Sequence, residues 1–257
     1  MLERFVEVNT ADGVMETFVT RPEKNGLFPA VIIYMDIWGV REELYDIARR
    51  VGVVGYCGVV PDLYYRHGRR IHFDFRNDNN QTISRDRLIG ENLRQILARP
   101  QLTNAMVTED TGALLEFLKG SESVRPGGVG AVGFCMGGRY VICAAARYPE
   151  QIIASASLHG TALITNQEDS PHRVLEHLRG DLYCGFGERD PHTPLTLIQE
   201  MEQLLSPCLV RYTFNVHSGV EHGYSLPDRD VYDKHAAARD WEIIFAMLNR
   251  KIPPYPR

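Results

Sequence analysis

The spacing of hydrophobic residues changes along this chain, and each change predicts a different element. Apolar and polar residues alternate at positions 4–8 and 15–20, on either side of Ala11-Asp12-Gly13. This pattern predicts a β-hairpin, because an Asp-Gly pair tolerates the backbone conformation of a tight turn. The continuous apolar run at 30–35, AVIIYM, instead predicts a short strand that is covered on both faces.

Further along, short apolar runs alternate with segments of helical period. The predicted strands lie at residues 56–60, 128–134, 152–158, 182–186 and 209–216. The predicted helices lie at residues 42–51, 104–119, 136–148 and 232–249. Strands that alternate with helices predict βαβ units. We therefore expect an α/β fold with a mostly parallel central sheet, helices on both faces and an N-terminal antiparallel hairpin.

Residues 63–99 fit neither pattern. They include the aromatic and charged stretch YYRHGRRIHFDFRNDNNQ. The length of this segment predicts a flap or lid over a site rather than a linker between domains. With 257 residues, of which 44% are hydrophobic, the chain has the size and composition of one large domain. We therefore expect a single domain over residues 1–257, with 63–99 as an insertion in it.

Charge and cysteine content narrow the classes of protein. The formal net charge is -5 and no block of Lys and Arg stands out, which argues against a nucleic-acid partner. No apolar stretch is as long as a membrane span, and the N-terminus lacks the pattern of a signal peptide. The five cysteines form no Cys-x-x-Cys pair, so neither a disulfide framework nor a zinc site is indicated. We expect a cytoplasmic protein without membrane partners.

One cysteine stands in a chemically informative place. In Gly133-Phe134-Cys135-Met136-Gly137, a predicted strand ends and a predicted helix begins. This is the nucleophile-elbow pattern Gly-x-nucleophile-x-Gly, with cysteine in the place usually held by serine. The helix N-terminus would favour the thiolate. The alternative is an ordinary turn whose small residues let the helix pack close to the sheet. The other cysteines are expected to be small buried apolar residues; they are Cys57, Cys143, Cys184 and Cys208.

A cysteine nucleophile requires a base, and the base requires a carboxylate that orients it. In folds of this kind the order along the chain is nucleophile, acid, histidine. Asp190, in GERDPHTP after the strand at 182–186, is the candidate acid, although a turn aspartate before proline has the same appearance. His217 and His222, in HSGVEHGYS, both follow the next strand, and their positions leave both open as the base. His192 lies too close to Asp190 in sequence to be the better candidate for the base. His159 is expected to have a structural role.

Five segments together resemble the dienelactone hydrolase family of α/β-hydrolases. They are YMDIWGV (34–40), VVPDLYYR (59–66), GFCMGG, GERDPHTP and EHGYS, and they occur in the family's order over nearly the whole chain. The resemblance implies Cys135 as nucleophile, Asp190 as acid and His222 as base, because the family's histidine precedes a small residue and an aromatic one. It also implies an oxyanion hole from the backbone N–H groups of Ile37 and Met136. No metal or cofactor is implied.

The chain departs from the family at two positions. Members that hydrolyse dienelactone carry a glutamate in the YMDIWGV segment, which helps to hold and activate the thiol; here the residue is Asp36. They also carry an arginine four residues after the histidine, which binds the substrate carboxylate; here the residue is Leu226. As an open alternative, an arginine of the predicted flap could bind the substrate carboxylate instead: Arg66, Arg69 or Arg70.

These observations predict a hydrolase of small ester or lactone substrates that uses a Cys-His-Asp triad. Aromatic side chains, among them Trp38 and Tyr64, are expected to line the site. One alternative is a general carboxylesterase or thioesterase without a lactone preference, which Leu226 favours. The other is a catalytically weak α/β-hydrolase homologue that binds a ligand. The expected partner is a small molecule, and the sequence predicts no particular oligomeric state.

Overall fold

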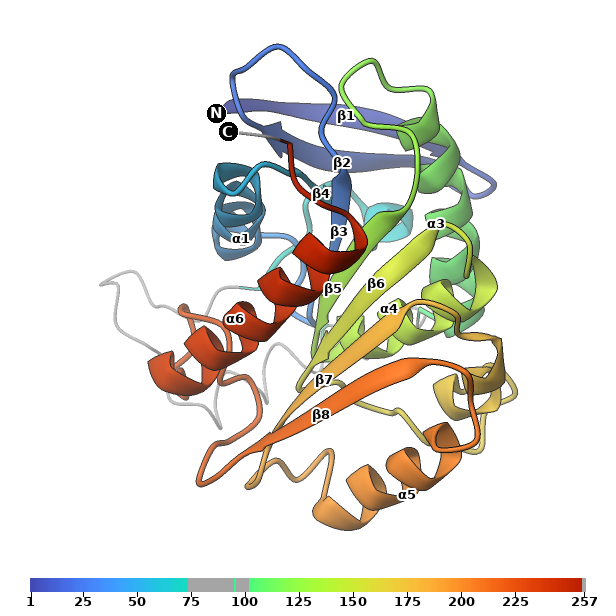
Figure 1. Ribbon diagram of the computed structural model, residues 1–257. Coiled ribbons are helices and arrows are strands. Elements are labelled where there is room, and N and C mark those ends of the chain that lie inside the picture. Colours follow the sequence, from blue (N-terminus) through green and yellow to red (C-terminus); the bar gives the residue numbers. More distant parts are fainter. Residues whose placement is uncertain (74–94, 96–101, 256–257) are drawn as a thin grey trace.

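The apolar runs of the sequence become the strands of one eight-stranded sheet (Figure 1). The computed structural model describes residues 1–73, residue 95 and residues 102–255. The elements in chain order are β1 (Leu2–Thr10), β2 (Gly13–Arg21), β3 (Ala30–Tyr34), α1 (Glu42–Val53), β4 (Cys57–Pro61), η1 (Tyr65–His67), α3 (Asn104–Lys119), β5 (Val129–Phe134), α4 (Met136–Arg147), β6 (Ile152–Leu158), η2 (Pro171–Arg173), η3 (Leu175–His177), β7 (Asp181–Gly187), α5 (Leu195–Leu205), β8 (Arg211–His217) and α6 (Lys234–Lys251).

The sheet has the strand order β1-β2-β4-β3-β5-β6-β7-β8. β1 and β2 form an antiparallel hairpin, β2 pairs antiparallel with β4, and the remaining strands pair in parallel. The predicted α/β-hydrolase architecture is therefore confirmed. The carboxyl ends of β3, β5, β7 and β8 meet at one edge of the sheet, and active sites of open α/β sheets are built at this edge.

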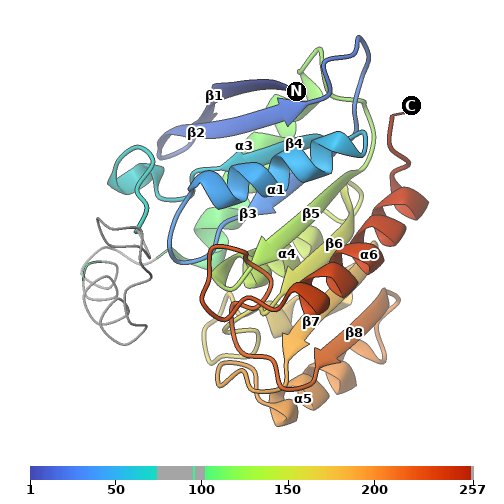
Figure 2. The ribbon, with the colours of Figure 1, turned by 90° about the vertical axis from the view of Figure 1, so that its left-hand side faces the viewer.

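Helices cover both faces of the sheet (Figures 1 and 2). α1 and α6 lie on one face, and α3, α4 and α5 lie on the other. β3 and β5 are buried along their whole length, as their continuous apolar sequences predict. At the sheet's antiparallel edge, Thr10 pairs with Gly13 across the two-residue turn Ala11-Asp12, and Gly13, the first residue of β2, has a positive φ of 141°.

Side-chain caps mark the residues at which two of the helices begin. The last helix begins at Lys234 rather than at residue 232, because the side chain of Asp233 accepts hydrogen bonds from the backbone N–H groups of His235 and Ala236. α3 begins at the predicted Asn104, after a Thr103 side chain that accepts from the Met106 N–H. Capping thus decides where an apolar pattern becomes a helix.

The predicted flap at residues 63–99 lies mostly outside the described residues. Its first part is described, and there a short 3₁₀ turn, η1, follows β4. Within the described ranges, no helix combines the length and the apolar character that crossing a membrane would need.

Candidate active site

The turn between β5 and α4 is strained at the predicted nucleophile. Cys135 has φ 54° and ψ -113°, a conformation that residues other than glycine rarely adopt. The two glycines of the motif make this turn possible. A Cβ at Gly133 would lie 2.2 Å from the Gly137 carbonyl oxygen, and a Cβ at Gly137 would lie 2.6 Å from the carbonyl oxygens of Tyr34 and Met35. The glycines therefore serve the elbow geometry and not only general close packing.

The same contacts place the end of β3 against the start of α4. Since Gly137 backs onto the Tyr34 and Met35 carbonyls, the loop that follows β3 begins beside the first turn of α4. Ile37 lies in this loop and Met136 is the first residue of α4. Their backbone N–H groups thus belong to segments that meet at Cys135, as the predicted oxyanion hole requires.

His222 lies between Asp190 and Cys135. Its Nδ1 is 2.6 Å from Asp190 Oδ2, and both side chains are buried. Burial by itself would lower the pKa of His222, but the charge of Cys135, hydrogen bonds to Asp190 and Cys135, and the charge of Asp190 raise it to about 10. The structure therefore brings together the three residues of the predicted triad, with His222 beside both Asp190 and Cys135.

The orientation of Asp190 is fixed from two sides. Its Oδ1 accepts a hydrogen bond of 2.8 Å from the backbone N–H of His192, and its Oδ2 faces His222. Burial would raise the pKa of Asp190, yet the hydrogen bond and charge of His222 outweigh burial and lower that pKa. Asp190 is thus held as a carboxylate that points at the imidazole.

The alternative base, His217, belongs to a different buried cluster. Its Nε2 lies 2.6 Å from Oδ1 of Asp240, a residue of α6 with no exposed surface. The hydroxyls of Tyr183 and Tyr224 donate to the same carboxylate at 2.6 and 2.5 Å. His217 and the two tyrosines therefore share one buried carboxylate, whereas the histidine that interacts with the Cys135 side chain is His222.

Two further imidazoles flank His222. The ring of His159 contacts it edge-on with centroids 5.0 Å apart, and the ring of His192 does so at 4.8 Å. His159 is fully buried, its Nε2 lies 2.8 Å from the Ser225 hydroxyl, and burial keeps its pKa well below the ordinary value. A neutral, buried ring beside His222 is consistent with the structural role predicted for His159.

Asp36 has different partners from those the family's glutamate suggested. The guanidinium of Arg41 binds it in a bidentate manner, at 2.8 and 3.1 Å, and the backbone N–H of Trp38 donates to Oδ1 at 3.0 Å. These contacts occupy both carboxylate oxygens. Asp36 thus organises the loop after β3, and none of its hydrogen bonds in the described part of the chain goes to Cys135.

The three remaining residues that were expected to line the site are largely buried. Leu226 has no exposed surface and packs in the main hydrophobic core, so it presents no surface to a ligand in this structure. Trp38 is 5% exposed, beneath the guanidinium of Arg229. The hydroxyl of Tyr64 donates a 2.8 Å hydrogen bond to the carbonyl of Ile37 and so supports the loop after β3.

The arginines at the start of the predicted flap are bound by acidic residues. Arg66 forms ion pairs with Asp12 and Asp110, at 2.6 and 2.7 Å. Arg69 and Arg70 both pair with Glu16, and Arg69 also pairs with Glu7. These contacts tie the segment to the N-terminal hairpin and to α3. The structure thus gives these three arginines partners other than a substrate carboxylate.

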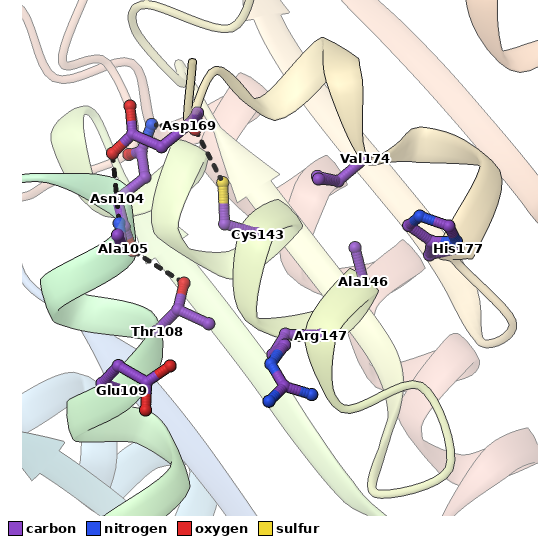
Figure 3. A pocket seen from close by; sticks show the side chains of 10 residues that line it. All are labelled: Asn104, Ala105, Thr108, Glu109, Cys143, Ala146, Arg147, Asp169, Val174 and His177. Carbon is purple, nitrogen blue, oxygen red and sulfur yellow. Dashed lines mark hydrogen bonds between the residues drawn. The ribbon is translucent and has the colours of Figure 1, made fainter. Parts of the chain in front are cut away.

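Cys143 lines a separate pocket of about 420 Å³ between α3, α4 and the segment 169–177 (Figure 3). Its thiol contacts the Asp169 carbonyl at 3.9 Å, and burial raises the pKa of the thiol to about 12. Cys57 and Cys184 are also buried, as predicted, whereas Cys208 is partly exposed. Among the described residues, no group of three or more His, Cys, Asp or Glu side chains could hold a metal ion.

Sequence reasoning missed the polar residues that hold the site together. Arg41 and Asp228 form an ion pair although 187 positions separate them, and Asp240 gathers side chains from β7, β8 and the loop after β8. No local pattern marks such residues. The sequence carries no signal for them, since charged neighbours flank both Asp240 (Arg239, Glu242) and Arg41 (Glu42, Glu43).

Comparisons with known proteins show which family and fold this chain resembles. The sequence model described as the dienelactone hydrolase family matches residues 15–252. A protein of Synechocystis that is provisionally named a carboxymethylenebutenolidase is 25% identical over 238 residues, which cover 91% of each chain. A similarly named protein of Saccharolobus solfataricus is 24% identical over 97% of this chain and 99% of its own.

Solved structures show the same fold. A Klebsiella pneumoniae protein provisionally named a dienelactone hydrolase superposes with a TM-score of 0.79 and 21% identity, over 97% of this chain and 98% of its own. The dienelactone hydrolase-like promiscuous phosphotriesterase P91, from metagenomic libraries, superposes with a TM-score of 0.72 and 18% identity over the same shares.

Proposed function

This chain belongs to the dienelactone hydrolase family, and from that premise we propose that it cleaves small esters or lactones through Cys135, His222 and Asp190. One observation carries the proposal above all. His222 lies 2.6 Å from a buried carboxylate on one side and is hydrogen-bonded to the cysteine of a strained elbow on the other. A nucleophile, a base and an orienting acid in this arrangement are the requirement for covalent acyl transfer.

The first half of the reaction forms a thioester. His222 takes the proton of Cys135, and the sulfur attacks the carbonyl carbon of the substrate. The carbonyl oxygen gains negative charge and accepts hydrogen bonds from the N–H groups of Ile37 and Met136. When the tetrahedral intermediate collapses, the carbon–oxygen bond to the leaving group breaks, and the His222 imidazolium returns its proton to the departing alkoxide.

The second half regenerates the enzyme. His222 takes a proton from a water molecule, which attacks the thioester, and the released sulfur recovers the proton from the imidazolium. The sum is ester plus water to acid plus alcohol; for a lactone, both products are parts of one hydroxy acid. Asp190 holds Nδ1–H in place, so that Nε2 is the nitrogen that exchanges protons. Side-chain and backbone groups thus supply every step, without a metal or cofactor.

The surroundings of Leu226 and of the three arginines support a second candidate function beside lactone hydrolysis. With Leu226 buried in the core and Arg66, Arg69 and Arg70 bound to acidic side chains, the arginine contact that suits a dienelactone carboxylate has no equivalent at these positions. A general carboxylesterase or thioesterase without lactone preference therefore remains the second candidate. The connected triad argues against a ligand-binding homologue without activity. We also propose a cytoplasmic location, since all five cysteines are free.

A substrate panel tests the proposal. Wild type, Cys135→Ala, Cys135→Ser and the control Cys208→Ala are assayed on small lactones and on linear aryl esters and thioesters of matched size. We expect turnover of at least one class, its loss in Cys135→Ala, and unchanged rates in Cys208→Ala. Comparable rates on lactones and linear esters would select the general esterase. Undiminished turnover in Cys135→Ala would overturn the assignment.

A further inference from the structure

One guanidinium connects two loops of the proposed site. Arg41 makes five hydrogen bonds, one for each of its N–H groups. Two go to Asp36, at 2.8 and 3.1 Å, and two go to Asp228, at 2.5 and 3.2 Å. The fifth goes to the carbonyl of Gly39 at 3.2 Å. Only arginine can satisfy two carboxylates in this forked manner, because lysine offers a point charge without a planar fork.

The two carboxylates belong to the loops that carry the proposed chemistry. Asp36 directly precedes Ile37, whose N–H is the proposed oxyanion donor, in the loop after β3. Asp228 lies six residues after His222, in the loop after β8. These loops come from distant parts of the chain, and Arg41 joins them directly.

Burial makes this link strong. Asp36 has no exposed surface, the Arg41 side chain is 8% exposed and the Asp228 side chain is 17% exposed. A guanidinium between two carboxylates at such burial is screened little by solvent. Loss of its fork would leave carboxylates unpaired in a poorly solvated place, and the two loops would then lose their common anchor.

We propose that Arg41 is a positioning residue that fixes the distance between the oxyanion donor at Ile37 and the base His222. This inference rests on the proposed triad and oxyanion hole. Arg41 touches neither substrate nor Cys135 in this role; it acts through Asp36 on one loop and through Asp228 on the other. A small shift of either loop would misplace the oxyanion donor relative to the base, and misplacement of about 1 Å costs roughly 100-fold in rate.

The chain offers a matched control. Arg66 also bridges two aspartates, Asp12 and Asp110, through four hydrogen bonds. Its partners lie in the turn of the N-terminal hairpin and on α3. The two arginine side chains are similarly buried, at 8% and 12% exposed, although Asp12 is more exposed than either partner of Arg41. Arg41→Lys and Arg66→Lys therefore remove the same kind of fork, one between the loops of the proposed site and one away from them. Asp228→Asn weakens the contact between Arg41 and the loop that carries His222, and it leaves the guanidinium in place.

The experiment measures kcat, KM, thermal unfolding and amide hydrogen exchange for these three variants and for Cys135→Ala. For Arg41→Lys we expect kcat to fall about 10- to 100-fold with little change in KM, and exchange to rise in both segments, 36–41 and 222–230. Asp228→Asn should show the same changes to a smaller extent. Arg66→Lys should keep kcat within about threefold of wild type, even if its melting temperature falls as much as that of Arg41→Lys.

The outcomes separate the two proposals. If Cys135→Ala keeps its turnover while exchange rises in both loops of Arg41→Lys, the triad is wrong and the link between the loops stands. If Cys135→Ala is inactive but Arg41→Lys leaves kcat and both loops unchanged, the link is wrong and the triad stands. If Arg41→Lys and Arg66→Lys lose equal amounts of kcat, in proportion to their loss of stability, Arg41 stabilises the fold in general and does not position the two loops.

Discussion

Two histidines at the carboxyl end of β8 have opposite assignments because of the carboxylates that they face. His222 presents Nδ1 to Asp190, which leaves Nε2 for the proton exchange that we propose with Cys135, whereas His217 uses Nε2 to bind Asp240. Tautomer and ring orientation follow from these contacts. The His217–Asp240 pair resembles a catalytic His–Asp pair in composition, but its carboxylate also accepts hydrogen bonds from Tyr183 and Tyr224, so we assign it a structural role.

Substitution of the two histidines should therefore give unequal results. We expect His222→Ala to lower kcat by roughly 1000-fold or more, because it removes the group that activates the nucleophile. His217→Ala should cost less than about tenfold, and mainly by loosening the buried cluster around Asp240. Steady-state kinetics with thermal unfolding of each variant measures both effects. A larger loss of kcat in His217→Ala than in His222→Ala would reverse the assignment.

At the scale of residues, the sequence identified what a local motif encodes. The glycines on either side of Cys135 predicted the elbow. The order of nucleophile, acid and histidine along the chain indicated Asp190 as the acid. The choice between His217 and His222 could not be made from spacing, and came only from resemblance to the family. The partners of Asp36 could not be predicted either. Whether an aspartate pairs with an arginine five residues later depends on the conformation of the loop between them.

At the scale of elements, the first turn of α1 contains an acid in an unfavourable place. Glu43 is partly buried, and burial together with the charge of Asp228 raises its pKa to about 7, in spite of the nearby Arg41. The folded state therefore holds this proton at pH values at which the unfolded chain has lost it. A carboxyl group whose pKa is raised on folding lowers stability as the pH rises from its ordinary value toward its folded value.

Glu43→Gln should remove this penalty. We expect no difference from wild type below about pH 4.5, a gain that grows between about pH 4.5 and pH 7, and a constant gain of about 1 kcal/mol above pH 7, since solvent screens part of the interaction. Urea unfolding at a series of pH values measures the gain. Glu116→Gln, at an exposed position of α3, serves as control. A gain at pH 4, or none at pH 8, would show that the buried carboxylate of Glu43 is not the source of the penalty.

The elements themselves were the most predictable feature. Their hydrophobic periods gave all eight strands and the helices α1, α3, α4 and α6, because burial on one or both faces leaves a strong pattern in the sequence. Their ends were less predictable, since a side-chain cap such as that of Asp233 competes with the apolar pattern. The packing of the helices α1 and α6 on one face follows from topology and is not visible in any single segment.

At the scale of the whole molecule, the pairing of charges leads us to expect a preference between neutral and anionic substrates. The described arginines at 66, 69 and 70 are paired with acidic side chains, and Leu226 is buried. An anionic substrate would then lack a charge-assisted hydrogen bond worth about 1.5–3 kcal/mol, or roughly 10- to 100-fold in kcat/KM. We therefore expect a neutral ester to have a higher kcat/KM than an ester of equal size that bears a carboxylate.

A matched pair of substrates measures this difference at several salt concentrations. The opposite preference would direct attention to Arg139, one helical turn after Cys135 on α4, which donates a 3.1 Å hydrogen bond to the hydroxyl of Tyr140. Arg139→Met would then abolish the preference for the anion.

Capture of the acyl-enzyme tests the central claim most directly. Wild-type protein is mixed with an activated aryl ester, quenched in acid before turnover is complete, digested and mapped by mass spectrometry. We predict a mass increase equal to the acyl group on the peptide that contains Cys135, at the thiol itself, and no such increase in Cys135→Ala, which should also have lost turnover. An acyl group on another residue, or full turnover in Cys135→Ala without any acylated cysteine, would contradict the account.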